Sequence, residues 1–272
     1  MNLIFFDLDG TLLNSASEIS PFTKETLALL DEKNIAYTVA TGRTMLSAKS
    51  ILKGHDFILP QVYSNGVTIW DPKSQELTLE NLLGSQEIST VIDLAISQGI
   101  TPFVHAIDDQ HYFIYHSSPR HKVEEELINT RYFHAKAKIL SIEELPTNSQ
   151  VTNISMIGVA EAINPILQEL KKNPNLVFYS GPAIEGGQFR WMDIHHCAAS
   201  KGAAVAAIKN QLGATNVICF GDSDNDLSMF ELADESYAPE NAKVNIRQVA
   251  NAVIGRNYED GVAHFLRERF SL

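Results

Sequence analysis

Apolar and polar positions near the N-terminus follow two different periods. Short apolar runs, LIFF at residues 3–6 and AYTV at 36–39, have the length and the aromatic and β-branched content of buried strands. Residues 21–34 (PFTKETLALLDEKN) show helical spacing and follow Ser20, a residue typical of a helix N-cap. MLSAKSILKG at 45–54 is a second helical pattern. Strands alternating with helices predict a parallel sheet.

A hairpin-like stretch follows at residues 65–79, with Asn65-Gly66 and Asp71-Pro72 in its turns. The alternation of strands and helices returns in the last third of the chain. The expected elements are a helix at 201–213, a strand at 216–220, a helix at 226–233, a strand at 235–239, a helix at 242–250, a strand at 251–254 and a helix at 260–270. Two similar patterns therefore flank a dissimilar middle segment.

The middle segment, residues 85–186, is expected to run helix, strand, strand, helix, strand, helix, strand. Its strands, such as HYFIYH at 111–116, are polar and aromatic, which is typical of antiparallel, partly exposed pairing. The chain is thus predicted to be an α/β protein with a doubly wound, mostly parallel (Rossmann-like) sheet core. Residues 1–84 and 187–272 form this discontinuous core, and residues 85–186 form an inserted α+β cap domain.

Composition and charge narrow the possible partners. With 272 residues, 44% of them apolar, the chain can bury the cores of two modest domains, and its net charge of −12 disfavours nucleic acid and anionic membranes. The start, MNLIFF, lacks the basic and long apolar segments of a signal peptide, so a cytoplasmic protein is expected. Only two cysteines occur, Cys197 and Cys219, which excludes a disulfide framework, and Cys219 is expected to be buried in a strand.

The first chemical signal is DLDGT, directly after the strand at residues 3–6. In an extended segment Asp7 and Asp9 point the same way, and two adjacent carboxylates at the end of a parallel strand favour a bound cation, with Mg²⁺ the expected ion. An Asp-Gly turn capped by Thr11 is the alternative, but it leaves Asp7 unexplained.

The second signal is GDSDND, with Asp222, Asp224 and Asp226 after the strand at 216–220. An EF-hand loop would require glycine at its sixth position and glutamate at its twelfth, where this chain has Leu227 and Ala233. A calcium loop is therefore excluded. Asp224 is expected to be a helix N-cap, which leaves Asp222 and Asp226 as functional candidates.

Two weaker signals are ATGR at residues 40–43 and SKG at 200–202. Thr41 offers a hydroxyl, Gly42 allows close approach to the backbone, and the helix start that follows favours an anion. For an isolated T-G-R, however, a turn with a surface Arg43 is the favoured explanation. Lys201 would stand in the first turn of a helix, where its charge opposes the helix dipole. This unfavourable placement indicates a possible function.

Taken in chain order, DLDGT, ATGR, SKG and GDSDND resemble the four motifs of the haloacid dehalogenase superfamily of phosphatases, and more narrowly its Cof-type branch. SNG at 64–66 and NYEDGVAHFL at 257–266 are also similar to that branch. The resemblance implies a phosphoric monoester hydrolase that uses Mg²⁺ and an aspartyl-phosphate intermediate. Its expected partner is a small phosphorylated metabolite, such as a sugar phosphate.

The resemblance also implies a role for each motif residue. Asp7 would be the nucleophile and Asp9 the general acid and base. Mg²⁺ would be held by the side chains of Asp7 and Asp222 and by the backbone carbonyl of Asp9, while Asp226 would support the waters of the metal and Lys201. The groups expected to bind the phosphoryl group or the rest of the substrate are Thr41, Gly42, Arg43, Asn225 and Lys201.

Some features leave alternatives open. In HHCAASKG, Ala198 stands where the branch commonly has glycine, and His195 and His196 could face the substrate or, with Cys197, hold zinc. Adjacent histidines point to opposite sides of an extended chain, which favours structural or polar-contact roles. A phosphomutase or phosphotransferase would use the same intermediate, and a phospholigand-binding regulator would have no use for a nucleophile. The substrate, pathway and oligomeric state cannot be inferred from the sequence.

Overall fold

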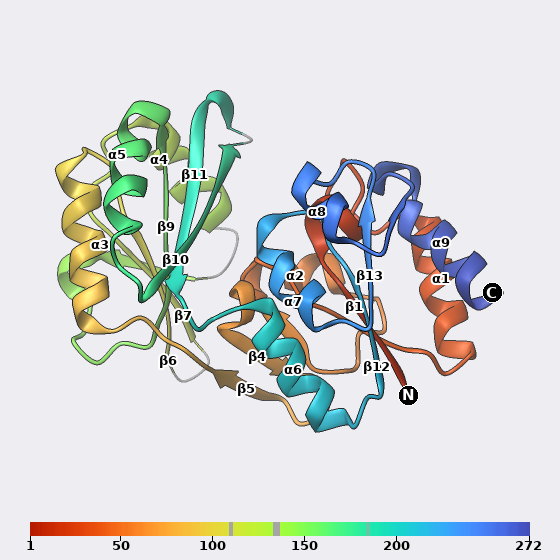
Figure 1. The fold of residues 1–272 in the computed structure, drawn as a ribbon. Coiled ribbons are helices and arrows are strands. Elements are labelled where there is room, and N and C mark those ends of the chain that lie inside the picture. Colours follow the sequence, from red (N-terminus) through yellow and green to blue (C-terminus); the bar gives the residue numbers. More distant parts are fainter. Residues whose placement is uncertain (109–110, 133–136, 184) are drawn as a thin grey trace. The chain divides into compact units, whose positions relative to one another are not determined.

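The computed structural model describes residues 1–108, 111–132, 137–183 and 185–272 (Figure 1). The chain forms two compact units: a core unit, Met1–Thr78 with Ser200–Leu272, and an inserted unit, Leu79–Ala199. These boundaries differ from the divisions at residues 84/85 and 186/187 drawn from the sequence. The second boundary differs because β11 (Gly186–His196) pairs along both edges with strands of the inserted unit.

The core unit contains a five-stranded sheet in the order β14-β13-β12-β1-β2, and every ladder in it is parallel. Its strands are β1 (Asn2–Phe6), β2 (Ala36–Val39), β12 (Asn216–Phe220), β13 (Glu235–Pro239) and β14 (Ala252–Ile254). Its helices are α1 (Pro21–Glu32), α2 (Met45–Leu52), α6 (Lys201–Leu212), α7 (Leu227–Leu232), α8 (Val244–Val249) and α9 (Gly261–Phe270). The predicted doubly wound, mostly parallel core is confirmed.

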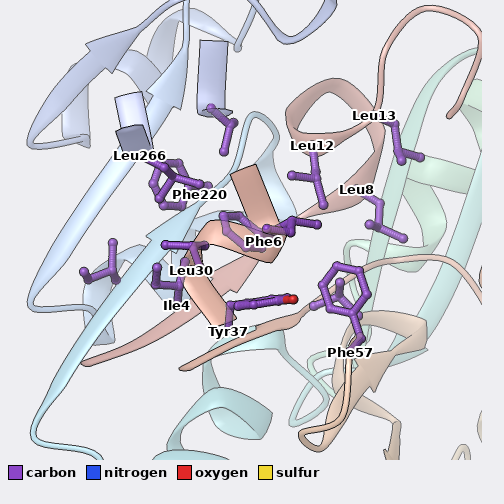
Figure 2. Close-up of a cluster of buried hydrophobic side chains, with 14 of the residues drawn as sticks. Ile4, Phe6, Leu8, Leu12, Leu13, Leu30, Tyr37, Phe57, Phe220 and Leu266 are labelled. Atoms are coloured by element: carbon purple, nitrogen blue, oxygen red, sulfur yellow. The ribbon is translucent and has the colours of Figure 1, made fainter. Parts of the chain in front are cut away.

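Both faces of this sheet are buried because alternate strand residues enter different apolar layers. Ile4 and Phe6 join the layer with α1 and α9, where Figure 2 shows Phe6 near Phe220, Leu30 and Leu266. Leu3 and Phe5 join the layer with α6, α7 and α8, and the predicted burial of Cys219 in this second layer is confirmed. The strands therefore read as continuous apolar runs.

Helix α1 begins as its sequence predicts. The Ser20 hydroxyl accepts a hydrogen bond from the backbone N–H of Thr23 at 3.0 Å, and Pro21 occupies the first helical position.

A small sheet, in the order β3-β4-β5, extends the core unit. It contains β3 (Gln61–Tyr63), β4 (Thr68–Asp71) and β5 (Glu76–Leu79). A short helical turn, Ser64–Gly66, joins β3 to β4, and a parallel bridge from Ala40 to Val62 ties β3 to the segment after β2. The turn after β3 therefore lies beside the loop that follows β2.

The inserted unit has a six-stranded sheet in the order β10-β11-β9-β6-β7-β8, antiparallel except for the β7–β8 pair. The other strands are β6 (Phe103–Asp108), β7 (His111–His116), β8 (Lys138–Ser141), β9 (Val151–Val159) and β10 (Leu176–Ala183), and the helices are α3 (Ser85–Ser97), α4 (Lys122–Leu127) and α5 (Ala160–Leu170). The described part of residues 85–186 thus contains one strand more than predicted. None of the helices in the described part of the chain has the length and apolar character needed to cross a membrane.

The two faces of this sheet differ in chemistry. One packs on α3 and α5 through Val104, Ile154 and Met192, whereas the other carries a network of polar side chains. In this network Asp193 accepts hydrogen bonds from Asn153 (2.7 Å) and contacts His195 Nε2 (2.8 Å), and His105 bonds the Ser155 hydroxyl at 2.8 Å. We call these five residues the polar network of the inserted unit.

The polar network makes the stability of the inserted unit depend on pH. Burial lowers the pKa of His105 to about 4. The charge of Asp193 opposes this shift and His195 adds to it, whereas the pKa of an unfolded histidine is ~6.5. Between these values the unfolded chain binds a proton that the folded chain does not, so stability is lost as pH falls through this window.

We expect the free energy of unfolding to fall by roughly 2 kcal/mol more in the wild type than in His105→Gln between pH 7 and pH 4. Glutamine keeps a hydrogen-bonding side chain but does not titrate. Urea denaturation of both proteins at each pH measures the difference, and identical pH dependence in the two proteins would contradict the role of His105.

Candidate active site

Three segments of the core unit bring the acidic and basic motif residues together. Asp7 directly follows β1, and its backbone N–H bonds the carbonyl of Phe220 at 2.9 Å, which extends the parallel ladder. Asp222 follows β12, and Lys201 is the first residue of α6, after the N-cap Ser200. The site therefore lies where strands of a parallel sheet end, the place where such sheets bind ligands.

Lys201 is completely buried between two carboxylates. Its Nζ donates to Asp7 Oδ1 at 2.5 Å and to Asp226 Oδ1 at 2.6 Å. Burial opposes a charged amine, but the two carboxylates outweigh it and raise the pKa of Lys201 above its usual value. Lys201 is thus a fixed cation at the helix start where its charge was predicted to be unfavourable.

Both carboxylate oxygens of Asp226 accept hydrogen bonds from nearby groups. Its second oxygen, Oδ2, accepts hydrogen bonds from the backbone N–H groups of Asp222 and Ser223, both at 2.9 Å. Asp226 therefore shapes the loop after β12 and holds Lys201 at the same time. Its expected support of the metal's waters stays a prediction.

The carboxylates of Asp7, Asp222 and Asp226 form an acidic group suited to a divalent cation, in which both oxygens of Asp226 are already hydrogen-bonded and those of Asp7 and Asp222 are the candidate ligands. They offer oxygen atoms within 4.8 Å of one another. Burial, together with repulsion from the other carboxylates, raises the pKa of Asp7 well above its usual value and that of Asp222 to about 6. A Cβ on Gly10 would lie 2.6 Å from Asp222 Oδ2, so glycine is needed for this approach. A hard cation that takes oxygen ligands would relieve the repulsion.

Asp222 is oriented by two hydroxyls. Thr11 Oγ1 donates to its Oδ1 at 3.3 Å, and Ser223 Oγ donates to its Oδ2 at 2.9 Å. Sequence reasoning considered Thr11 only as the cap of an Asp-Gly turn and missed its contact with the loop after β12.

Thr41, Gly42 and Asn225 meet around a residue that the sequence indicated only as part of a turn, Asn65. Asn225 Nδ2 donates to Asn65 Oδ1 at 2.8 Å, and the Asn65 backbone N–H donates to the Thr41 carbonyl at 3.1 Å. A Cβ on Gly42 would lie 3.1 Å from Asn65 Oδ1. Asn65 thus links the loops after β2 and β12.

The backbone conformation of the SNG turn explains why an asparagine stands at position 65. Ser64 and Asn65 both have positive φ, 47° and 55°, in the region that asparagine tolerates better than most residues. At Gly66, with φ 101°, a Cβ would come within 2.2 Å of the Ser200 carbonyl oxygen. The SNG turn therefore packs directly against the start of α6, a long-range contact that turn chemistry alone does not predict.

Asp9 and Arg43 form a forked ion pair. Arg43 Nε and Nη2 donate to the two oxygens of Asp9, each at 2.6 Å. The Asp9 side chain is 53% exposed and that of Arg43 25% exposed. Hydrogen bonding to Asp9 raises the pKa of Arg43 above its usual value. The structure thus pairs Arg43 with the candidate acid, a contact that the sequence did not predict.

Two expectations for flanking residues are resolved. Asp224 is not a helix N-cap: Ser223 caps the short turn at Asp224–Asp226, and the Asp224 carboxylate instead bonds Lys243 (2.7 Å) and Asn245 (2.8 Å). His195 is buried against Asp193, and Cys197 is exposed. Within the described ranges the HHC segment supplies no metal-binding group of three, so the zinc alternative has no support.

Comparisons with known proteins agree with the resemblance of the motifs. A model of the haloacid dehalogenase-like hydrolase family matches residues 4–266. A 5-amino-6-(5-phospho-D-ribitylamino)uracil phosphatase of Bacillus subtilis is 27% identical over 276 residues, which cover 99% of this chain and 98% of that protein. The pyridoxal phosphate phosphatase of Escherichia coli is 26% identical over 276 residues, 97% of each chain.

The fold is shared with a solved haloacid dehalogenase-like hydrolase from B. subtilis. The two chains superpose with a TM-score of 0.80 at 24% identity, over 98% of this chain and 99% of the other. The predicted family resemblance is confirmed over nearly the whole chain.

Replacing Lys201 by methionine removes the cation between Asp7 and Asp226 and leaves both carboxylates buried. We expect Lys201→Met to lower the free energy of unfolding by roughly 3–5 kcal/mol, because uncompensated buried charge is strongly destabilising. Urea denaturation without divalent metal measures the loss. Lys209→Met on the same helix is the matched control, since Lys209 makes only a partly exposed pair with Asp234 at 3.6 Å. Equal losses in the two variants would contradict the account of Lys201.

Proposed function

Because this chain belongs to the haloacid dehalogenase-like hydrolase family and is a phosphatase, we propose that it hydrolyses small organic phosphate monoesters in the cytoplasm, with Mg²⁺ as cofactor. Sugar phosphates and related metabolites are the proposed substrate class. The observation that carries the proposal is the buried Lys201 between Asp7 and Asp226, with Asp222 adjacent. This arrangement places a candidate nucleophile beside fixed positive charge.

In the first proposed step, an oxygen of Asp7 attacks phosphorus. A bond forms between Asp7 and phosphorus, the ester P–O bond breaks, and the leaving oxygen takes a proton from Asp9. In the second step, Asp9 accepts a proton from water, whose oxygen attacks the aspartyl-phosphate. Inorganic phosphate leaves and Asp7 is regenerated. Asp7 Oδ1 is bound to Lys201, so its other oxygen, Oδ2, is the proposed attacking atom.

Charge on the transferred phosphoryl group must be matched by fixed donors. Lys201 supplies a buried cation, and Thr41 and Asn225 supply donors from the loops that Asn65 holds together. Mg²⁺ would be held by Asp7, Asp222 and the backbone carbonyl of Asp9, and when bound it would neutralise phosphoryl charge. The roles of all these residues are proposals.

The substrate class is supported by the named relatives and by charge. The B. subtilis relative is named for a phosphoribitylaminouracil and the E. coli relative for pyridoxal phosphate, which are both small phosphorylated metabolites. They differ in the part of the molecule that leaves, so the family indicates the reaction more closely than the substrate. A net charge of −12 also disfavours polyanionic substrates.

A screen of phosphorylated metabolites with Mg²⁺ present tests the proposed reaction. Release of inorganic phosphate from one or more monoesters, lost on chelation of the metal, is the expected result. Repeating the assay with added sugar acceptors separates hydrolysis from transfer, because a phosphotransferase or phosphomutase would yield a new phosphate ester instead of phosphate. Binding without turnover would favour a regulator.

Matched amide substitutions separate the roles of the two motif aspartates. We expect Asp7→Asn to abolish turnover in a folded protein, because the amide cannot attack phosphorus. Asp9→Asn should keep Mg²⁺ affinity, since its proposed ligand is a backbone carbonyl, while turnover falls by roughly 10²–10⁴-fold. Phosphate release and calorimetric Mg²⁺ titration measure both. Loss of Mg²⁺ binding in Asp9→Asn as large as that in Asp222→Asn would argue against these assignments.

The polar network supports a role of the inserted unit in substrate selection, because it gives one face of the sheet hydrogen-bonding side chains, three of which (His105, Ser155 and Asp193) are partly exposed. We expect that replacing Leu79–Ala199 by the matching segment of the B. subtilis ribitylaminouracil phosphatase shifts preference toward that phosphatase's named substrate by roughly 10-fold. Hydrolysis of 4-nitrophenyl phosphate, whose leaving group needs few contacts, should change much less. An unchanged substrate ranking in a folded chimera would place specificity in the core unit.

A further inference from the structure

The proposed reaction asks Asp9 to hold a proton within reach of the leaving oxygen, yet its side chain is half exposed on the turn after β1. An exposed aspartate samples several rotamers. A general acid must instead lie at hydrogen-bond distance from the atom it protonates. Something must therefore restrict the Asp9 side chain, and Arg43 is the residue in contact with both of its carboxylate oxygens.

The backbone of Arg43 is held in place by hydrogen bonds on both sides, as a residue that positions Asp9 requires. Its backbone N–H donates to the Thr41 hydroxyl at 3.1 Å, and its carbonyl accepts from the Ser64 backbone N–H at 2.9 Å. These bonds fix the base of the side chain to the loop after β2 and to the SNG turn. The Arg43 side chain is also less exposed than the Asp9 side chain that it holds, 25% against 53%.

The geometry of the pair fixes direction as well as distance. A forked contact through Nε and Nη2 defines the plane of the carboxylate, which a single-point contact from lysine would not do. The fork uses one acceptor position on each oxygen, and each carboxylate oxygen has a second. The second position on each oxygen therefore stays open for a hydrogen bond to the leaving oxygen while Arg43 holds the carboxyl group in place.

The Arg43–Asp9 contact contributes little to folding, and a similar pair away from the site serves as its control. Partly exposed ion pairs contribute about 0–1 kcal/mol to folding. The core unit contains a comparable forked pair, in which Arg269 bonds the two oxygens of Glu235 at 3.3 and 3.0 Å. Glu235 begins β13, so that pair lies at the amino ends of the strands, away from the candidate site.

From these contacts we infer that Arg43 is a positioning residue that holds the Asp9 carboxyl in place for proton transfer to the leaving oxygen, instead of a ligand of the phosphoryl group. This inference rests on the proposed phosphatase function. In the step concerned, the bond between Asp7 and phosphorus forms, the ester P–O bond breaks, and the proton of Asp9 passes to the departing oxygen. Arg43 gains or loses no atom in this step.

The leaving group distinguishes positioning of the acid from binding of phosphate. Phenyl phosphate and 4-nitrophenyl phosphate share the same ring and phosphoryl group, but the phenolate needs protonation far more than the nitrophenolate. We expect Arg43→Ala to lower kcat/KM for phenyl phosphate by roughly 10-fold more than for 4-nitrophenyl phosphate. In an Asp9→Asn background the same substitution should add no further difference between the two esters. Arg269→Ala is the matched control and should leave both values unchanged.

Other outcomes would overturn the inference. Equal losses for both esters, in both backgrounds, would show that Arg43 binds the phosphoryl group. Unchanged kcat/KM for both esters would show an ion pair without a catalytic role. If the wild type releases no phosphate, or if Asp9→Asn itself does not discriminate between the two esters, the proposed function or its acid is wrong and the inference falls with it. Those two failures are visible without any Arg43 variant.

Discussion

The candidate site depends on one buried ion pair network, in which Lys201 bonds Asp7 and Asp226. Each member comes from a different segment, so the network joins the end of β1, the start of α6 and the loop after β12. Removing Lys201 would leave two buried carboxylates without a compensating cation. The same contacts place the proposed nucleophile beside a permanent cation, and the remaining acidic group, Asp222, completes an oxygen-rich set suited to a divalent ion.

The parallel sheet explains why these segments meet. Strands β1, β2 and β12 are adjacent and run in the same direction, so the residues that follow them lie at one edge. Close backbone approaches at Gly10 and Gly66 then bring the loops within contact of Asp222 and Ser200. The parallel sheet brings the loops to one edge, and glycine at positions 10 and 66 leaves room for them to approach each other closely.

Much of the core unit and of its acidic site could be predicted from the sequence, because short local patterns specify them. The apolar runs of the core strands, the Ser20 cap and the aspartates at strand ends are encoded within a few residues each, and the doubly wound core followed from them. The second boundary of the inserted unit was harder to predict from the sequence. The residues of β11, GGQFRWMDIHH, are polar at many positions, and only their pairing with β9 and β10 assigns them to the inserted sheet. The roles of Asn65, Thr11 and the Arg43–Asp9 pair depend on long-range contacts that no local pattern specifies.

In the proposed mechanism, Asp7 carries the phosphoryl group during turnover. The most direct measurement is rapid quenching of Asp9→Asn with 4-nitrophenyl phosphate and Mg²⁺, followed by mass spectrometry of the peptide that contains residue 7. Because this substitution removes the base proposed for hydrolysis of the intermediate, a phosphoryl adduct on Asp7 should accumulate, and it should be absent when Asp7→Asn is added. Phosphate release without an adduct, or an adduct on another residue, would contradict the account.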